Sequence, residues 1–367
     1  MHPLEIFCCQ NPSCPDVGVR GNGNLRWHGY SGHKRLIRGL FCRTCKKYFS
    51  ERKGTVLEHS RLQEGTAISV LEHMREGCGV RSTARLVGVC PNTVIRLARI
   101  SGKHALEVHD EKVEISPKTR EVQFDEKWGF VYKKEANCSS GEEDRGDNWD
   151  HTAIDAEHRL LLSIVPGKRT SDQCDKVVEE VKKRTGDRTD LLLTSDEHAP
   201  YKTSIQKAYS VEEQCPEHTG TKKTKKMPDN LCYATVRKTR KGGRVIEVCK
   251  TLVFGVLSLL VMLLSFSTAS FTINTSFVER HNATDRGQNA RKARKTLRFS
   301  KNWEVHNAMT FFVAYSYNFC WPVRTLRVRN EHGRWEARTP AMSAGLAQHV
   351  WTTREWVLFP ARPARSA

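Results

Sequence analysis

The pattern of apolar and polar positions divides the chain into three parts. Residues 62–108 show the apolar spacing of helices. From about residue 120 onward, strand-like and helical patterns alternate, which predicts an α/β domain. The first sixty residues instead contain four suitably spaced cysteines, several glycines and many lysines and arginines. We therefore expect a small cysteine-containing module, a helical module and an α/β domain.

Residues 80–100 predict two short helices around a sharp turn. Gly88 supplies the turn, and Pro91 suits the first turn of the second helix, where its missing N–H costs nothing. The inward-facing positions are Ala84, Leu86, Val87, Val94, Ile95 and Leu97. This arrangement is typical of a helix-turn-helix, and an ordinary helical hairpin in a core is the alternative.

The outward-facing side chains of this unit are of the types that contact DNA. In a recognition helix such residues reach phosphates and base edges. The predicted DNA-binding residues here are Arg81, Asn92, Thr93, Arg96 and Arg99.

Two further segments have distinctive patterns. Residues 231–255 contain two partly alternating runs around Gly242 and Gly243, which predicts a β-hairpin with a tight glycine turn. Its basic side chains lie either along DNA or on a solvated face. Residues 251–278 contain no charged residue, and we expect a buried helix there. A membrane span is the alternative, although the fully apolar core is short for one.

Composition narrows the function. The 367 residues suggest two or three domains, and 38% hydrophobic residues are enough for a real core. The chain is therefore neither disordered nor a disulfide miniprotein. A formal net charge of +19 favours a nucleic-acid partner over a charge that only aids solubility.

The thirteen cysteines point to metal binding rather than to disulfides. The chain opens without a basic stretch leading into an apolar signal core, so we expect a cytoplasmic protein in a reducing compartment. Cys9 and Cys14 form a CxxxxC pair, and Cys42 and Cys45 form a CxxC pair. Two such pairs can bring four thiolates around Zn²⁺, as in a zinc ribbon.

Two alternatives to this zinc site remain open. The cysteines can be unliganded and buried, or Cys8, His28 or His33 can replace one of the four thiolates. The stretch between the pairs is basic, which favours a ribbon that faces phosphates. Its cations are Arg20, Arg26, Lys34, Arg35 and Arg38.

Three acidic residues lie at positions in the predicted strands and helices where their carboxylates could take part in catalysis. Asp125 is placed where a strand ends, Asp196 just past the next strand, and Glu279 on a helix. Arg286 follows two turns after Glu279 on the same helix face. Three carboxylates can fix two Mg²⁺ ions for phosphodiester chemistry, because such ions prefer hard oxygen ligands. Taken singly, each acid can instead end a strand, cap a helix or form a surface ion pair.

With these residues in place, the chain resembles bacterial transposases of the insertion-sequence-one type, which are DDE enzymes with a ribonuclease H-like core. The resemblance covers nearly the whole chain, and INTSFVER followed by a basic KTLRFSK run is its most specific part. Its other motifs are CRTCKKYFSERKGT, VRSTARLVGV, PNTVIRLARI, FDEKWGFV, TAIDAEHRLLLSIVPGKRT, YSYNFCWPVRTLR and RTPAMSAGL.

The resemblance implies a role for each part of the chain. Asp125, Asp196 and Glu279 would form the catalytic triad and bind Mg²⁺ or Mn²⁺, and Arg286 would hold DNA together with Arg291 and Lys295 of the following basic run. Asp155 is expected to be structural. The predicted organisation is a zinc ribbon (1–60), a helix-turn-helix (61–110), a ribonuclease H-like catalytic domain with a hairpin insertion (118–325) and a tail (326–367).

The implied function is transposition. The protein would bind the terminal inverted repeats of an insertion sequence, then cut and join DNA as a homo-oligomer associated with the nucleoid and not with a membrane. A catalytically inactive DNA-binding regulator is the alternative. One departure stands out: where similar proteins have a charged amphipathic helix, this chain has GVLSLLVMLLSFSTASF. Two compensating frameshifts are one hypothesis for this segment.

Overall fold

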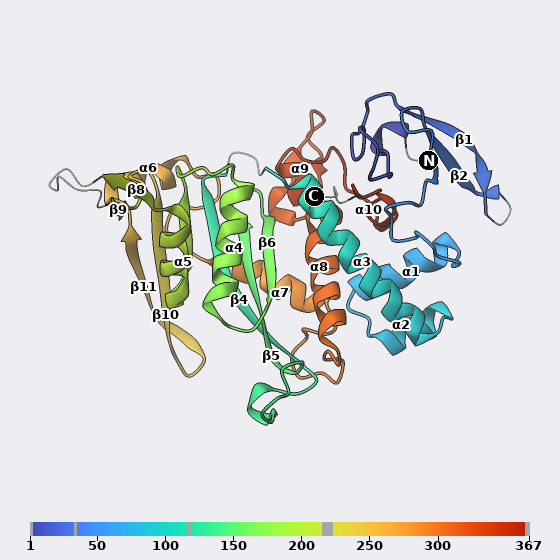
Figure 1. Cartoon of the computed structure of the whole chain (residues 1–367). Coiled ribbons are helices and arrows are strands. Elements are labelled where there is room, and N and C mark those ends of the chain that lie inside the picture. The colour runs from blue at the N-terminus through green and yellow to red at the C-terminus, as the bar shows by residue number, and fades with distance from the viewer. Residues whose placement is uncertain (1–2, 33–34, 116–118, 215–222, 364–367) are drawn as a thin grey trace.

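The computed structural model describes residues 3–32, 35–115, 119–214 and 223–363 (Figure 1). The amino-terminal part forms a three-stranded antiparallel sheet in the order β1-β2-β3. Its core contains Phe7, Leu25 and Leu40 around the cysteines. The elements of this part are η1 (Leu4–Ile6), β1 (Leu25–Ser31), β2 (Ile37–Cys42) and β3 (Tyr48–Ser50).

Three helices follow: α1 (Glu64–Arg75), α2 (Val80–Val87) and α3 (Pro91–Lys112). Gly88 ends α2 with a φ of 72°, a left-handed conformation that glycine adopts without strain. Pro91 is at the start of α3, as predicted.

The prediction of two short helices is wrong for the second, because α3 has 22 residues. The apolar period continues through Ala105 and Val108, which are fully buried. Helix α3 packs along α8 (Trp303–Cys320), and Gly102 allows the two backbones to approach closely at Ala308. Leu86, expected to face inward, is 62% exposed.

A six-stranded mixed sheet forms the centre of the remaining chain, in the order β11-β10-β7-β4-β5-β6. Strands β4, β5 and β6 form an antiparallel meander, whereas β7 runs parallel to both β4 and β10. The strands are β4 (Glu121–Val131), β5 (Gly146–Asp155), β6 (Leu160–Gly167), β7 (Leu192–Asp196), β10 (Cys232–Lys241) and β11 (Arg244–Phe254). The structure therefore has the mixed α/β class that the alternating pattern predicts.

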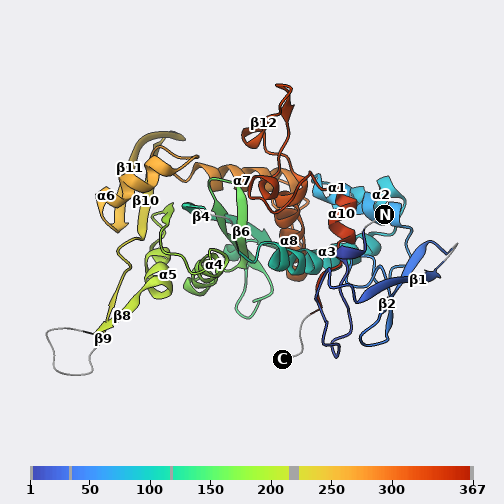
Figure 2. The same ribbon diagram turned by 90° about the horizontal axis from the view of Figure 1, so that it is seen from above.

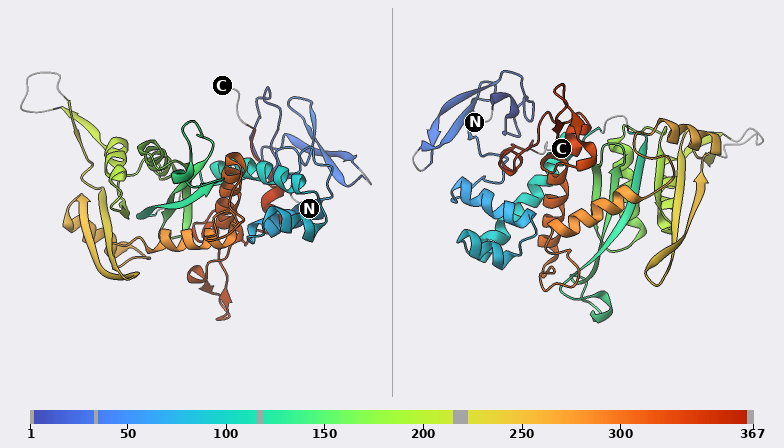
Figure 3. Two further views of the ribbon diagram at one scale, coloured as in Figure 1. Left: turned by 90° about the horizontal axis from the view of Figure 1, so that it is seen from below. Right: turned by 180° about the vertical axis from the view of Figure 1, so that it is seen from behind.

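Helices cover both faces of this sheet (Figure 3). Helices α4 (Ser171–Arg184) and α5 (Ala199–Tyr209) pack against one face, while α7 (Ser276–Gln288) and α8 lie on the other. The parallel strands are connected through helices, as parallel pairing requires. The short strands β8 (Val211–Gln214) and β9 (Lys223–Lys226) pair with each other beyond α5.

The predicted hairpin is confirmed. Strands β10 and β11 pair antiparallel over their length, from Tyr233 opposite Phe254 to Lys241 opposite Arg244. Gly242 and Gly243 both have positive φ, at 57° and 78°, as a tight turn between such strands requires.

The expectation of a buried apolar helix is wrong. Helix α6 (Leu257–Phe266) has ten residues, of which only Leu260 and Leu263 are buried, and Phe266 is 59% exposed. The helix covers the end of the sheet at β10 with one narrow face, so most of its apolar side chains remain outside. Among the described helices, none has the length and apolar character needed to cross a bilayer.

The carboxy-terminal residues return to the amino-terminal sheet (Figure 2). The backbone N–H of Val56 donates to the carbonyl of Val357, and that of Ala361 donates to the carbonyl of Gly54. Trp356 is fully buried in the main core. The elements of this part are η4 (Arg324–Leu326), β12 (Val328–Arg329), β13 (Trp335–Glu336), α9 (Pro340–Ser343) and α10 (Thr353–Leu358). One further short element, η3 (Glu135–Asn137), lies in the central domain between β4 and β5.

Candidate metal and DNA sites

The four predicted cysteines come together at the edge of the amino-terminal sheet. All four ligand atoms of Cys9, Cys14, Cys42 and Cys45 lie within 4.8 Å of one another. The sulfurs of Cys9 and Cys45 are 3.6 Å apart, and those of Cys14 and Cys42 are 3.9 Å apart. Four sulfurs at about 2.3 Å from a tetrahedral Zn²⁺ would be spaced by nearly these distances. This cluster could therefore bind zinc.

The alternative ligands are elsewhere. Cys8 is buried beside the cluster, but its sulfur accepts a hydrogen bond from Gln10 at 3.3 Å. The ring of His28 packs against Tyr48, with centroids 4.6 Å apart. His33 and Lys34 lie outside the described residues. Although burial opposes a thiolate, hydrogen bonds from Asn11 and from the backbone of Lys47 lower the pKa of Cys45 to about 7.

The expectation of a phosphate-facing ribbon is wrong for two of its cations. Arg20 forms a bidentate pair with Glu111 on α3, at 2.6 and 2.7 Å, and so holds the ribbon against the helices. Arg38 pairs with Glu51 at 2.7 Å. Arg26 and Arg35 are exposed and remain available to a partner.

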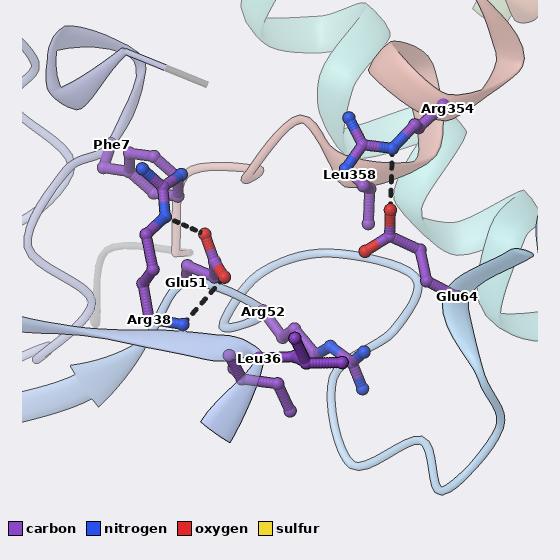
Figure 4. Close-up of a pocket in the computed structure, with 9 residues that line it drawn as sticks. Phe7, Leu36, Arg38, Glu51, Arg52, Glu64, Arg354 and Leu358 are labelled. Carbon is purple, nitrogen blue, oxygen red and sulfur yellow. Dashed lines mark hydrogen bonds and ion pairs between the residues drawn. The ribbon is translucent and has the colours of Figure 1, made fainter. Parts of the chain in front are cut away.

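A small cavity lies where this sheet meets the helices (Figure 4). Its volume is about 140 Å³, and its acidic side chains are both paired. Glu51 pairs with Arg38, and Glu64 pairs with Arg354 at 2.7 Å. Because these charges neutralise each other within the cavity wall, the cavity is part of the packing between two modules rather than a charged ligand site.

The predicted recognition residues are mostly accessible at the start of α3. Asn92 and Arg96 are exposed, Thr93 is half-buried, and Arg81 is exposed on α2. Arg99 is also exposed, but its guanidinium pairs with Glu304 on α8 at 2.9 Å.

The three carboxylates approach one another from three elements. Asp196 is the last residue of β7. Asp125 lies in the middle of β4, not at its end as predicted, because β4 continues beside β5 after its pairing with β7 stops at Gln123 opposite Thr194. Two residues beyond that last pair, Asp125 and Asp196 are level on neighbouring strands. Glu279 is in the first turn of α7, as predicted for a helix.

Asp125 has a strongly shifted pKa. Burial raises the pKa of Asp125 to about 6; the hydrogen bond from Asn282 opposes this rise, whereas the charges of Asp196 and Glu279 add to it. A nearby negative charge raises the pKa of a carboxyl group because it disfavours the ionised form. Both other carboxylates therefore act electrostatically on Asp125.

The carboxylate oxygens are nevertheless not gathered as closely as the sulfurs. Among the described residues, the four cysteines are the only group of three or more His, Cys, Asp or Glu side chains gathered closely enough to hold a metal ion. Glu279, which is 44% exposed, accepts a hydrogen bond from Thr275 at 2.7 Å and forms an ion pair with Lys238 of β10. The ammonium group of Lys238 thus supplies the positive charge beside Glu279.

Strand β4 fixes the position of α7 through side chains on one face. The side-chain oxygen of Gln123 accepts hydrogen bonds from the backbone N–H groups of Phe277 and Val278, at 3.0 and 3.2 Å. These two groups lie in the first turn of α7, where no helical acceptor exists. Asp125, two residues along the same face, accepts from Asn282 at 2.8 Å. Glu279 lies between these two attachment points.

A buried group of four charges makes the third attachment. Lys127, the next residue on that face, forms an ion pair with Asp285 of α7, and its ammonium is 3.3 Å from Asp150 of β5. Lys292, just beyond α7, is 2.6 Å from Asp150 and 3.2 Å from Asp285. All four side chains are at most 2% exposed. Such a group is stable only when every charge has its partner.

The basic residues after Glu279 differ in accessibility. Lys295 is exposed and Arg286 is half-buried, with Asp125 among the charges that act on it. Arg291 is only 9% exposed, so it lies largely below the open surface. Asp155 is fully buried, and its oxygens accept from Thr119 and His158, both at 2.7 Å, as expected for a structural residue.

Several residues around the carboxylates were not predicted from the sequence. Gln123 and Lys127 alternate with Asp125, and Asn282 follows Glu279 by three residues, so their spacing could have identified them. Lys238, on the hairpin, has no such signal. Glu126 has no such signal either. Burial raises the pKa of Glu126 to about 7; the charge of Asp196 adds to this rise and Arg169 opposes it.

No family model matches the chain. Among solved structures, similarity is found to a Mos1 strand transfer complex, with 12% identity over 40% of this chain and 55% of that chain, at a TM-score of 0.17. A pre-cleavage Mos1 transpososome gives 11% identity over 40% and 57%, at the same TM-score. The chain therefore spans little more than half the length of these proteins, and similarity at this level does not establish a shared fold.

Proposed function

We propose that the protein is a DNA transposase of the insertion-sequence-one type, with a ribonuclease H-like catalytic core. One observation supports this most strongly: Asp125 and Asp196 are level on neighbouring parallel strands, with Glu279 on α7, the helix that packs against β4. The sheet supports it as well. An antiparallel meander of three strands, extended from its first strand by two parallel strands, is the strand order expected of that core.

The chemistry follows from the donor set. Two Mg²⁺ or Mn²⁺ ions held by Asp125, Asp196 and Glu279 would activate the attacking oxygen and stabilise the leaving oxygen. In the first step the oxygen of a water attacks the phosphorus at the element end, and the 3′ oxygen leaves as a hydroxyl group. In the second, that hydroxyl attacks a target phosphodiester and displaces its 3′ oxygen, so one ester bond forms as one breaks.

The protein's own residues place the reactants. Gln123, Asp125 and Lys127 fix α7 relative to β4, so that Glu279 has a defined position opposite the two aspartates. Arg286 and Lys295 would hold the DNA backbone beside the carboxylates. Arg81, Asn92, Thr93 and Arg96, in a helix-turn-helix made by α2 and α3, would contact the terminal inverted repeats, and a Zn²⁺ on the four cysteines would stabilise the ribbon.

The two ends of the element must be processed together, so we expect a homo-oligomer on double-stranded DNA. We expect this assembly in the cytoplasm, associated with the nucleoid. A regulator that binds the ends without cutting them is the second candidate, and the ion pair between Lys238 and Glu279 favours it. The two differ in one respect. The regulator binds end DNA equally well with and without Mg²⁺ and never nicks it.

The test is strand transfer of labelled element ends with Mg²⁺ or Mn²⁺. Wild type should form product, and Asp125→Asn and Glu279→Gln should lose it by more than about a hundredfold, since each removes a charge on which the metal site depends. Asp172→Asn, at an exposed position in the first turn of α4, is the matched control and should keep activity. Equal product from all four proteins would remove the catalytic assignment.

A further inference from the structure

A cavity of about 540 Å³ opens between the three-helix part and the loop that connects α7 to α8. Its walls come from the start of α2, the start of α3 and the segment from Ala290 to Asn302. Pockets of this volume are in the range that holds small organic ligands. Two of the predicted DNA-binding residues, Arg81 and Arg291, line it from opposite modules.

The charged side chains that line this cavity are all cations. They are Arg81, Arg291, Arg298 and Lys301, and no acidic residue is among the lining side chains. This contrasts with the smaller cavity of Figure 4, where each glutamate has an arginine partner. A concentration of positive charge without a counter-charge in a concave site attracts anions.

Arg291 is the most informative of these residues. It is nine-tenths buried, and burial lowers its pKa to about 10. Within the described part of the chain its guanidinium has neither a hydrogen-bond acceptor nor an ion-pair partner. Leaving a buried cation unpaired costs free energy, because the group loses its hydration without gaining an acceptor. An anion in the cavity would supply the missing acceptor.

The first turn of α2 adds a second anion-binding feature. Gly79, Val80, Arg81 and Ser82 all line the cavity. Helix α2 has no side-chain cap at Gly79 and no acidic residue in its first turn. The backbone N–H groups at this end of α2 thus have no capping side chain, and the residues that carry them line the cavity. An uncapped helix N-terminus at a concave site is an arrangement that binds phosphate groups.

The remaining walls are apolar. Val80, Ile95, Leu297 and Phe299 line the cavity beside the cations, and Leu297 is 90% exposed. A base has two apolar faces that stack on such side chains, whereas a phosphate alone would leave them without a partner. A duplex is too wide to enter a cavity of this size, but a single unpaired nucleotide is not.

We infer that this cavity binds one unpaired nucleotide of a DNA strand. The phosphate contacts Arg291 and the first turn of α2, and the base packs against Ile95 and Phe299. The inference rests on the proposed function for the source of the nucleotide, a strand opened at or near the element end. It adds a binding site between the end-recognition helices and the catalytic sheet.

The test is calorimetric titration of the zinc-loaded full-length protein with deoxyadenosine monophosphate, inorganic phosphate and deoxyadenosine, at low salt. We expect the monophosphate to bind more tightly than either fragment. Arg291→Met should weaken it by about tenfold or more, since a charged hydrogen-bonding group is lost. Arg291→Lys should lose less. Arg334→Met, at an exposed position on the turn before β13, is the matched control and should change little.

A second variant tests the apolar half without touching a charge. Ile95→Trp fills the cavity, so it should abolish binding of the nucleotide while inorganic phosphate still binds. Equal nucleotide affinity in wild type, Arg291→Met and Ile95→Trp would overturn the inference, and so would phosphate binding as tightly as the nucleotide. Asp125→Asn should bind the nucleotide normally, which separates the two proposals. A failure of strand transfer with nucleotide binding intact would count against the proposed function alone. A loss of nucleotide binding with strand transfer intact would count against this inference alone.

Discussion

The four cysteines and the three carboxylates are both sets of ligands drawn from distant parts of the chain, but they differ in how far the fold has gathered them. The cysteine sulfurs already lie within 4.8 Å of one another. The carboxylates share an electrostatic environment, yet their oxygens are further apart and Glu279 is paired with Lys238.

The difference reflects what holds each set in place. The cysteines lie on tight turns of one small sheet with little core of its own, so their spacing follows from local backbone geometry. The carboxylates are placed by the register of β4 with β7 and by three attachments of α7 to β4. The backbone register determines where the residues that carry the carboxylates lie. A bound cation and DNA must still bring their oxygens closer together.

The largest effect is expected from removing zinc. Cys42→Ser should abolish binding of one equivalent of Zn²⁺ and unfold the sheet of β1 to β3, because structural zinc contributes about 10–16 kcal/mol of binding free energy in comparable small modules. Zinc content by mass spectrometry, together with hydrogen exchange over residues 25–50, measures this. Cys249→Ser, outside the cluster, is the control. A full equivalent of zinc in Cys42→Ser would show that other ligands are sufficient.

Breaking the buried charge group should come next. Lys127→Met leaves Asp285 and Asp150 with one ammonium between them, and should lower the free energy of unfolding by about 3–5 kcal/mol. Denaturant unfolding measures it, with the exposed Lys103→Met as control. Lys127→Met combined with Asp285→Leu should recover part of the loss, since fewer charges are then unpaired. A loss below about 0.5 kcal/mol, the size usual for surface sites, would mean that α7 is held in another way.

The buried side chain of His104 allows the packing between α3 and the carboxy-terminal residues to be tested by a change of pH. Burial lowers the pKa of His104 to about 4, opposed by its hydrogen bond to the carbonyl of Phe359 at 2.7 Å. The folded protein binds a proton at His104 less readily than the unfolded chain, whose histidine pKa is about 6.5. The contribution of neutral His104 to stability is therefore fully present above about pH 6.5 and is lost as the pH falls towards 4. His104→Gln should therefore cost less at pH 5 than at pH 7, by on the order of 2 kcal/mol.

Unfolding of both proteins by denaturant at the two pH values measures this difference. A cost of His104→Gln that does not change with pH would show that His104 takes up its proton in the folded protein as readily as in the unfolded chain.

The smallest effect is expected at Lys238. Its ammonium competes with a metal ion for Glu279, so Lys238→Met should raise Mn²⁺ affinity several-fold, as expected for removing one partly exposed ion pair. Lys250→Met, which loses only a hydrogen bond to Thr272, is the control. Titration without DNA measures the affinity. A weaker affinity in Lys238→Met would mean that the lysine positions Glu279 rather than competing for it.

Local patterns explain what could be predicted from the sequence. The two cysteine pairs, the glycine turn at Gly242 and Gly243, and the helix containing Glu279 all depend on residues close together in the chain. The position of Asp125 within β4 could not be predicted, since it depends on the different lengths over which β5 and β7 pair with that strand.

Burial of charged residues was equally hidden. Arg291 and Lys292 belong to a basic run that is typical of a solvated or DNA-facing surface, but tertiary packing places both inside. The apolar helix α6 was mispredicted for the opposite reason. Its composition indicates burial, yet the sheet offers it only a narrow contact at β7 and β10.

The most direct test of the central claim is the number of divalent ions that the three carboxylates bind. Zinc-loaded protein with element-end DNA should bind two Mn²⁺ ions per chain in a titration followed by electron paramagnetic resonance. Asp125→Asn and Glu279→Gln should each lose at least one of them, and Asp172→Asn should lose none. The same number and affinity of Mn²⁺ ions in all four proteins would contradict a metal site made by Asp125, Asp196 and Glu279.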